Sequence, residues 1–287
     1  MRAIAEFIMR GRMQAALVAF CGNLVPLISP AAVALVGLRK GWKDSLLIAL
    51  WALLPSLIMF YVSDLNPLVV MASITGVVMV VVAAEVLKAS ISWRHTLMVV
   101  SAGSGTLAIL LSVLFGAELT SLQQSLAKVF AEMQSGQGAQ KSVGFVPGET
   151  FIVGLIGYIV ALNVVLGLIL ARWWQALLYN PGGFRTEFHQ LRLGSKEALI
   201  LLAVVVFCQF GSAEYFSWAE LFGLPLLLSG IALVHYTVAT RKMGGHWLVI
   251  FYVGLVTIAP LSLGLVVIGF VDSFMNFRPR LAGNSSR

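Results

Sequence analysis

Residues 150–171 of the chain read TFIVGLIGYIVALNVVLGLILA and contain no charged side chain. An α-helix rises about 1.5 Å per residue, so a run of this length reaches across the hydrocarbon layer of a bilayer, which is roughly 30 Å thick. The segment is therefore predicted to be a transmembrane helix.

Seven further apolar segments surround this one. The chain is 59% hydrophobic and 11% charged, with a mean hydropathy of +0.94, whereas soluble domains carry roughly 25% charged residues. We expect an all-α, polytopic transmembrane bundle with about eight or nine membrane-inserted helical segments, forming a single integral membrane domain over residues 1–287. The other segments are Met13–Leu38, Ser45–Val62, Pro67–Leu87, Thr96–Phe115, Ala198–Phe210, Trp218–Val238 and Trp247–Val271.

The net charge of +7 lies mostly in basic residues between the apolar segments. This distribution is a membrane-orientation signal rather than a sign of nucleic-acid binding, because loops rich in lysine and arginine stay in the cytoplasm. If the first segment is a hairpin broken at Pro26 and Pro30, the N-terminus is cytoplasmic and both leading basic clusters lie inside. A single span would instead place one of these clusters outside.

The same alternation places residues 118–149 in an extracytoplasmic loop and residues 172–196 in a cytoplasmic loop of a bacterial inner membrane. The last segment contains Pro260, and the arginines beyond it slightly favour a re-entrant segment with a cytoplasmic C-terminus. The residues predicted to face the cytoplasm are Arg2, Arg10, Arg12, Arg39, Lys40, Lys43, Lys88, Arg94, Arg172, Arg185, Arg192, Lys196, Arg241 and Lys242. The predicted outer loops hold Asp64, Glu118, Glu132, Glu149, Glu214 and Glu220, with Lys128 and Lys141.

Residue patterns that support catalysis are scarce. No two of the four histidines are spaced i, i+4, and the chain has neither a phosphate-binding glycine loop nor a nucleophilic serine elbow. Cys21 and Cys208 are isolated in apolar runs. We expect no enzymatic activity, no metal site and no cofactor.

Polar side chains inside the apolar segments must find partners within the bundle. One interpretation is hydrogen bonding and close packing between helices. The other is a ligand-lined cavity. The segment SLQQSLAKVFAEM, residues 121–133, is expected to form a short helix on the outer surface or across the bundle, or a lid over such a cavity. The candidate substrate-binding residues are Asn23, Ser101, Ser104, Thr106, Asn163 and Gln209.

The stretch ARWWQALLYNPGGFRTEFHQLRLG, residues 171–194, combines aromatic and basic residues around a Pro-Gly-Gly break. It is interpreted either as an interfacial anchor for the fifth segment or as a docking surface for a cytoplasmic partner. The candidate partner-binding residues here are Trp173, Trp174, Arg185 and Phe188.

This stretch resembles the corresponding one in the YybS-like bacterial membrane proteins, a family without an established function. That family is similar in fold to the substrate-capturing subunits of energy-coupling-factor transporters and to MreD-type proteins. The resemblance implies that an Ala-x-x-x-Ala motif in the first helix contacts a coupling subunit. Ala15 and Ala19 match that motif.

Two functional hypotheses follow. The chain, with the lipid bilayer around it, captures or transports a small molecule as a transporter subunit, with coupling through Ala15 and Ala19. Alternatively, it is a membrane scaffold that recruits cytoplasmic or cell-envelope partners through residues 173–193.

Overall fold

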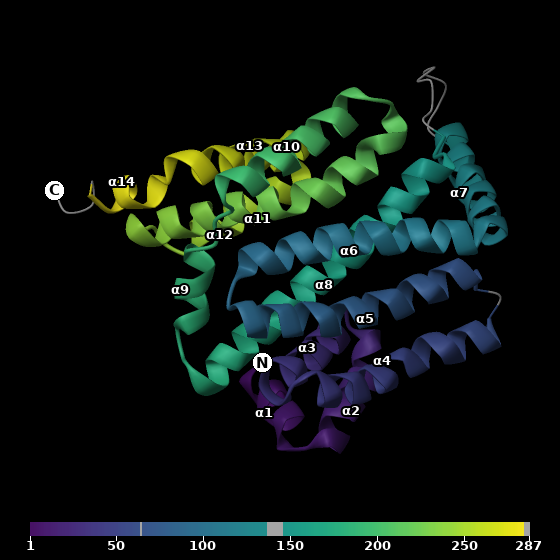
Figure 1. Ribbon diagram of the computed structural model, residues 1–287, viewed down its shortest axis with the longest axis horizontal. Coiled ribbons are helices and arrows are strands. Elements are labelled where there is room, and N and C mark those ends of the chain that lie inside the picture. Colours follow the sequence, from purple (N-terminus) through teal and green to yellow (C-terminus); the bar gives the residue numbers. More distant parts are fainter. Residues whose placement is uncertain (64, 137–145, 284–287) are drawn as a thin grey trace.

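The computed structural model describes residues 1–63, 65–136 and 146–283, which form α-helices and two short 3-10 helices, η1 and η2 (Figure 1). The long helices run side by side, and the helix ends gather at two opposite ends of the molecule. The elements are α1 (Arg2–Arg10), α2 (Arg12–Cys21), η1 (Gly22–Leu24), α3 (Ile28–Lys40), α4 (Trp42–Val62), α5 (Pro67–Ser90), α6 (Trp93–Leu114), α7 (Gly116–Gly136), α8 (Glu149–Tyr179), α9 (Gly183–His189), α10 (Ser195–Phe210), η2 (Ala213–Tyr215), α11 (Phe216–Thr240), α12 (His246–Thr257), α13 (Ala259–Met275) and α14 (Phe277–Gly283).

Within the described residues, five helices are long and apolar enough to cross a membrane. They are α4, α5, α6, α8 and α11 with the preceding η2. The pair α12 and α13 also qualifies when taken together, but it is bent by 114°. The all-α class is thus confirmed, whereas eight or nine membrane-inserted segments are not. The difference arises at the first and sixth segments, because α2, α3 and α10 contain only 10, 13 and 16 residues.

The first apolar segment folds as a helical hairpin, as its two prolines predicted. Helix α2 ends at Cys21, the chain turns through η1, and α3 returns against α2. Arg12 at the start of α2 pairs with Asp44 at 2.7 Å, just beyond the end of α3, so both ends of the segment lie together. The Ser45 hydroxyl donates to the Val33 carbonyl at 2.9 Å and ties α4 to the returning helix.

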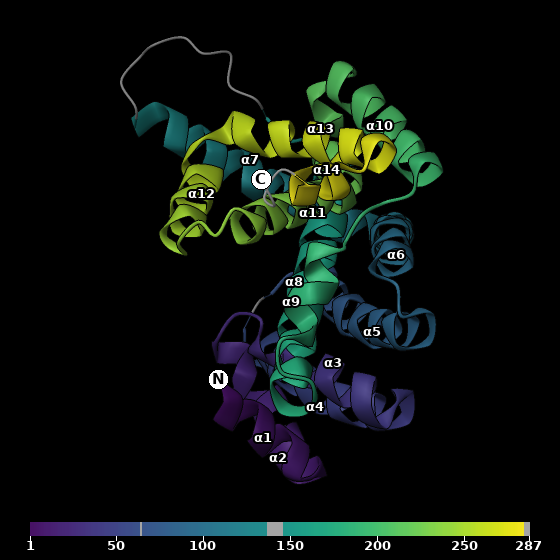
Figure 2. The same ribbon diagram turned by 90° about the vertical axis from the view of Figure 1, so that its left-hand side faces the viewer.

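The last segment is broken between Thr257 and Ala259, where Pro260 cannot donate to the preceding turn. Helix α12 begins shortly after α11 ends, and the chain beyond α13 comes back to the same end of the molecule. There the Arg278 guanidinium bonds the carbonyls of His189 and Leu191, in the connection between α8 and α10. Figure 2 faces this end and shows α9, α12 and α14 there.

The end shown in Figure 2 will be called the basic end, because contacts there join several of the basic residues predicted to be cytoplasmic. The Arg39 guanidinium lies 3.8 Å from the centre of the Tyr179 ring, and Arg94 pairs with Glu197 at 3.6 Å. Arg172 pairs with Glu187 at 2.8 Å.

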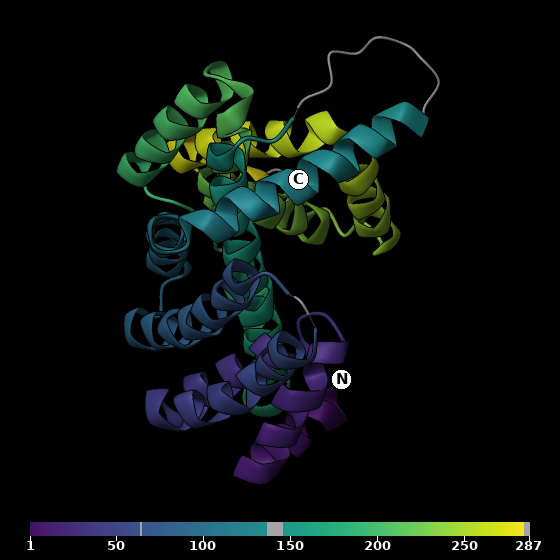
Figure 3. The ribbon, with the colours of Figure 1, turned by 90° about the vertical axis from the view of Figure 1, so that its right-hand side faces the viewer.

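The opposite end will be called the acidic end. Glu214 accepts hydrogen bonds there from the backbone N–H groups of Gly148 and Phe151, and Glu149 accepts one from Thr120. Figure 3 faces this end and shows α7 lying across it. Asp64 and Lys141, predicted to belong here, lie outside the described residues.

Both long polar intervals contain more helix than the sequence predicted. The interval 118–149 holds most of α7, a 21-residue helix that begins at Gly116. In the interval 172–196, α8 continues to Tyr179 and the short α9 follows. The 31 residues of α8 make it about 45 Å long, and it runs obliquely through the molecule (Figure 1).

Helices α11 and α13 approach backbone to backbone through two glycines. A Cβ atom at Gly269 would lie 2.1 Å from the Leu226 carbonyl oxygen, and one at Gly230 would lie 2.3 Å from that of Leu265. Small residues permit this close approach between membrane helices, where dispersion contacts replace the hydrophobic effect.

The substitution Gly269→Ala is expected to lower the free energy of unfolding by about 1–3 kcal/mol, because the new methyl group forces α13 away from α11. Gly264→Ala, in the same helix, is the control, since nothing lies within 4 Å of its Cβ position. That control is expected to be neutral or stabilising. Thermal unfolding of the purified variants in detergent measures both, and equal transition temperatures would contradict the close approach.

Candidate functional site

One candidate site is a cavity of about 450 Å³ between the turn of the first hairpin and helices α4, α5, α7 and α8. Its walls are mainly aliphatic, and Leu122 and Leu126 of α7 form part of them. Asn23 and Asn163, two of the predicted substrate-binding residues, both line it. We call it the amide cavity.

Asn23 is fixed by the end of helix α2. Its side-chain NH2 group donates to the carbonyls of Ala19 at 3.0 Å and Ala52 at 3.1 Å. The Ser29 hydroxyl also donates to the Ala19 carbonyl, at 2.7 Å. The last carbonyls of a helix lack hydrogen-bond donors within the helix. The Asn23 and Ser29 side chains provide such donors at the end of α2. The Asn23 NH2 group is thereby used, whereas its Oδ1 atom accepts no hydrogen bond from the described part of the chain.

Asn163 lies near the middle of α8 and is exposed. Its amide has no hydrogen-bond partner among residues 1–63, 65–136 and 146–283. Ser73, another lining residue, donates to the Val69 carbonyl of its own helix at 3.1 Å. The described lining includes no charged side chain. The cavity therefore presents amide donors and acceptors on an apolar surface, which suits an uncharged ligand.

The other four predicted substrate-binding residues lie elsewhere. Ser101 and Ser104 are buried in α6, where a Cβ atom at Gly157 of α8 would lie 3.4 Å from the Ser104 carbonyl oxygen. Thr106 donates to the Ala102 carbonyl one turn earlier. Gln209 is exposed on α10 and does not line the cavity. Both serines therefore lie in the packed interior and not at the cavity, and the Ser104 hydroxyl has no hydrogen-bond partner among the described residues.

A second cavity, of about 330 Å³, lies at the basic end between α8, α9, α11 and α12. We call it the aromatic cavity. Trp173, Arg185 and Phe188, all predicted to bind a partner, line it. Trp174, predicted to do the same, is fully buried, so it belongs to the core and offers no docking surface.

Ala15 and Ala19 are also buried, at 1% and 0% exposure. The prediction that they contact a coupling subunit is therefore corrected. Helix α2 packs against α3 and α4, so the small-residue spacing is already used within the chain.

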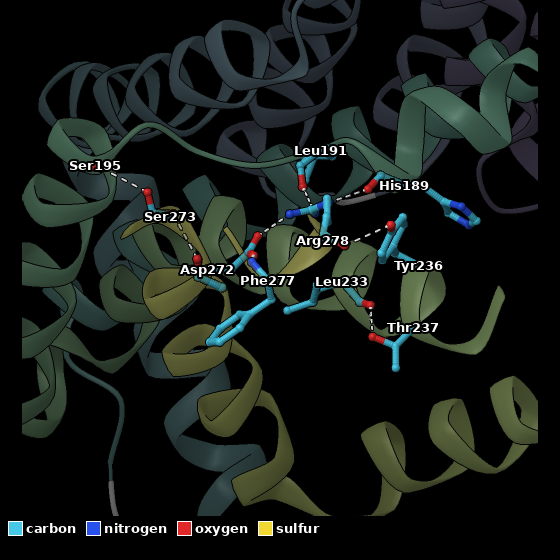
Figure 4. Close-up of polar contacts among 11 residues, drawn as sticks. His189, Leu191, Ser195, Leu233, Tyr236, Thr237, Asp272, Ser273, Phe277 and Arg278 are labelled. Carbon is cyan, nitrogen blue, oxygen red and sulfur yellow. Dashed lines mark hydrogen bonds and ion pairs between the residues drawn. The ribbon is translucent and has the colours of Figure 1, made fainter. Parts of the chain in front are cut away.

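The structure also contains a buried ion pair that the sequence analysis missed (Figure 4). Asp272 is fully buried and pairs with Arg278, which also donates to the carbonyls of His189 and Leu191 at 2.7 Å. Asp272 accepts from the Phe277 N–H at 3.0 Å. Together these contacts attach α13 and α14 to the segment that carries α9. The available signal was an aspartate directly after the last apolar segment, followed by an arginine six positions later.

Among the described residues, no group of three or more His, Cys, Asp or Glu side chains is placed to hold a metal ion. Comparison of the chain with protein-family models, curated proteins and solved structures finds no match.

We expect Arg278→Met to lower the free energy of unfolding by about 3–5 kcal/mol, because it leaves the buried Asp272 carboxylate without its partner. Arg12→Met is the control, since it breaks the largely exposed pair with Asp44 and should cost about 0–1 kcal/mol. Thermal unfolding in detergent compares the two variants. A loss for Arg278→Met no larger than for the control would show that the buried pair does not hold this end together.

Proposed function

We propose that the chain is an integral membrane protein that captures a small, uncharged and largely apolar molecule in the amide cavity. The supporting observation is that Asn23 and Asn163, on separate elements, open onto one cavity whose other walls are mainly apolar. Ligand sites typically combine such walls with a few polar groups that fix the ligand's orientation.

The size and charge of the cavity define the ligand class. Small-molecule cavities have volumes of about 300–1,000 Å³, and the amide cavity falls in this range at about 450 Å³. A charged ligand would be left there without a counter-ion, which is costly away from water. A carbonyl or hydroxyl group bonded to Asn163 would satisfy the amide without that cost.

Helix α7 is the proposed cover of this cavity. It contributes Leu122 and Leu126 to the wall and is attached near its start, where the Asn66 amide donates to the Glu118 carbonyl at 2.8 Å. Most of the α7 side chains that are described remain exposed or half-buried. Displacement of α7 would open the cavity from the acidic end.

The proposed orientation places the basic end and the N-terminus in the cytoplasm of a bacterial cell, with the acidic end and α7 outside. The positive-inside trend supports it, because predicted cytoplasmic residues such as Arg39, Arg94 and Arg172 make their contacts at one end. Ligand capture would then occur from the outer side, as expected of the receptor component of an uptake system.

The scaffold hypothesis has weaker support. Of residues 173–193, Trp174, Phe188, Leu191 and Leu193 are buried against the chain itself. These four side chains are therefore unavailable to a partner.

Asn163→Leu is expected to reduce the amount of ligand that co-purifies with the protein about tenfold, because a buried polar group of the ligand loses its partner. Gln209→Leu is the matched control, since it changes an exposed amide outside the cavity. Mass spectrometry of small molecules extracted from the purified variants measures the effect.

A second variant tests the cavity itself. Gly76 lines it, and the nearest atoms to its Cβ position lie 3.9 Å away, so Gly76→Leu places side-chain atoms in the open space. It should displace the same compound. A compound retained equally by both cavity variants and by Gln209→Leu, or no compound at all with the unmodified protein, would contradict the proposal.

A cytoplasm-only fluorescent reporter fused after Arg287 is expected to fluoresce, because the chain beyond α13 returns to the basic end. The same reporter fused before Met1 should also fluoresce. Signal from the N-terminal fusion alone would mean that α12 and α13 form one broken span and would overturn the re-entrant arrangement.

A further inference from the structure

The aromatic cavity has a different chemistry from the amide cavity. Trp173 of α8, Phe184 and Phe188 of α9, and Tyr252 of α12 form its apolar walls. The Phe184 and Phe188 rings are stacked, with their centres 5.7 Å apart. The Tyr252 hydroxyl lies 2.8 Å from Nε2 of His235 on α11.

Polar contacts made by residues outside its lining hold this cavity in shape. Arg172 Nε donates to both carboxylate oxygens of Glu187, at 3.1 and 3.0 Å, and a terminal guanidinium N–H donates to Oε2 at 2.8 Å. Trp93 donates its indole N–H to the same carboxylate. Arg278 donates to the carbonyls of His189, the last residue of α9, and of Leu191. When the side chains of a site are already ordered before the ligand binds, binding avoids the entropic cost of ordering those side chains.

The charges that line the cavity are unbalanced. Arg185 lines it, and no carboxylate of the described chain lies within ion-pair distance of its guanidinium group. The lining adds His189 and His235 and no acidic residue. Burial lowers the pKa of His189, and Arg185, His235 and Arg278 lower the pKa further. The guanidinium group of Arg185 is thus the charge of this lining that lacks a counter-ion, which favours an anion.

We propose that the aromatic cavity binds the phosphate group of an anionic membrane lipid through Arg185, with the apolar part of the lipid against Trp173 and Tyr252. The guanidinium fork matches a phosphate in two-point geometry. Basic cavities between helices on the cytoplasmic side are suited to anionic headgroups, and aromatic rings suit the interface where headgroups lie. The inference rests on the membrane insertion and the orientation given under the proposed function, but not on ligand capture in the amide cavity.

The test is titration of the purified full-length protein in detergent with phosphatidylglycerol or phosphatidylcholine, with bound lipid counted by native mass spectrometry. Arg185→Gln is expected to weaken phosphatidylglycerol binding about tenfold. Arg241→Gln is the matched control, since Arg241 is exposed near the end of α11 and does not line the cavity. It should change the affinity less than twofold, and phosphatidylcholine should bind more weakly throughout.

A second variant separates the cavity from general surface charge. Ala176→Phe fills space in the lining and leaves every charge in place, so it should weaken phosphatidylglycerol binding as Arg185→Gln does. Thermal unfolding without added lipid confirms that the variants are folded. Asn163→Leu should leave the lipid affinity unchanged, which separates failure of this inference from failure of ligand capture.

Two results would overturn the inference. Equal weakening by Arg185→Gln and Arg241→Gln would mean that the lipid is attracted by the basic end in general. Inorganic phosphate that displaces phosphatidylglycerol at equal concentration would mean that the cavity holds a soluble phosphate and not a lipid.

Discussion

Backbone N–H and C=O groups cannot remain unpaired inside hydrocarbon, and specific side chains meet this constraint where helices of this protein break. Asn23 and Ser29 donate hydrogen bonds to the Ala19 carbonyl near the end of α2. Arg278 donates to two carbonyls at and just beyond the end of α9. At the acidic end, Glu214 accepts from the first N–H groups of α8. These contacts pair backbone groups that lack a partner within their own helix.

The same constraint gives the two asparagines of the amide cavity different roles. Asn23 is required by the fold, because its NH2 group pairs with the carbonyls of Ala19 and Ala52. Asn163 has no such role within the described chain, although an unpaired amide in the middle of a membrane helix carries a cost. In the proposed function, a ligand in the cavity would pair with this amide.

The features of the fold that could be predicted from the sequence are those that depend on residues close together in the chain. Uncharged runs located the long helices, and Pro26, Pro30 and Pro260 located the breaks in the first and last segments. Basic residues predicted to share one side do make contacts at one end of the molecule, as Arg39 and Tyr179 illustrate. Depth along a segment, however, does not determine which way a side chain faces. Asn163 and Gln209 were equivalent candidates and both are exposed, yet only Asn163 lines the amide cavity.

Contacts between segments far apart in the chain could not be predicted either, because position along a segment does not determine which neighbour a side chain faces. Ala15 and Ala19 have a spacing that indicates helix contact, but the spacing does not say whether the contacting helix belongs to the same chain. Trp174 and Trp173 are neighbours, yet the helix turn buries the first completely and places the second in a cavity wall. Asp272 follows an apolar run as a loop residue would, and only the return of Arg278 makes it a buried partner.

Helix α8 lines both cavities. The two cavities differ in chemistry because they lie at different positions along this helix. Asn163, near its middle, is accompanied by neutral residues in the amide cavity, whereas Trp173, nearer its end, shares the aromatic cavity with Arg185. Ten residues of helix separate the two positions by about 15 Å. The cost of a charge falls from the centre of a bilayer toward its interface. A site at half depth must therefore recognise its ligand with amides, whereas a site at the interface can use a cation, and one continuous helix supplies a wall for each.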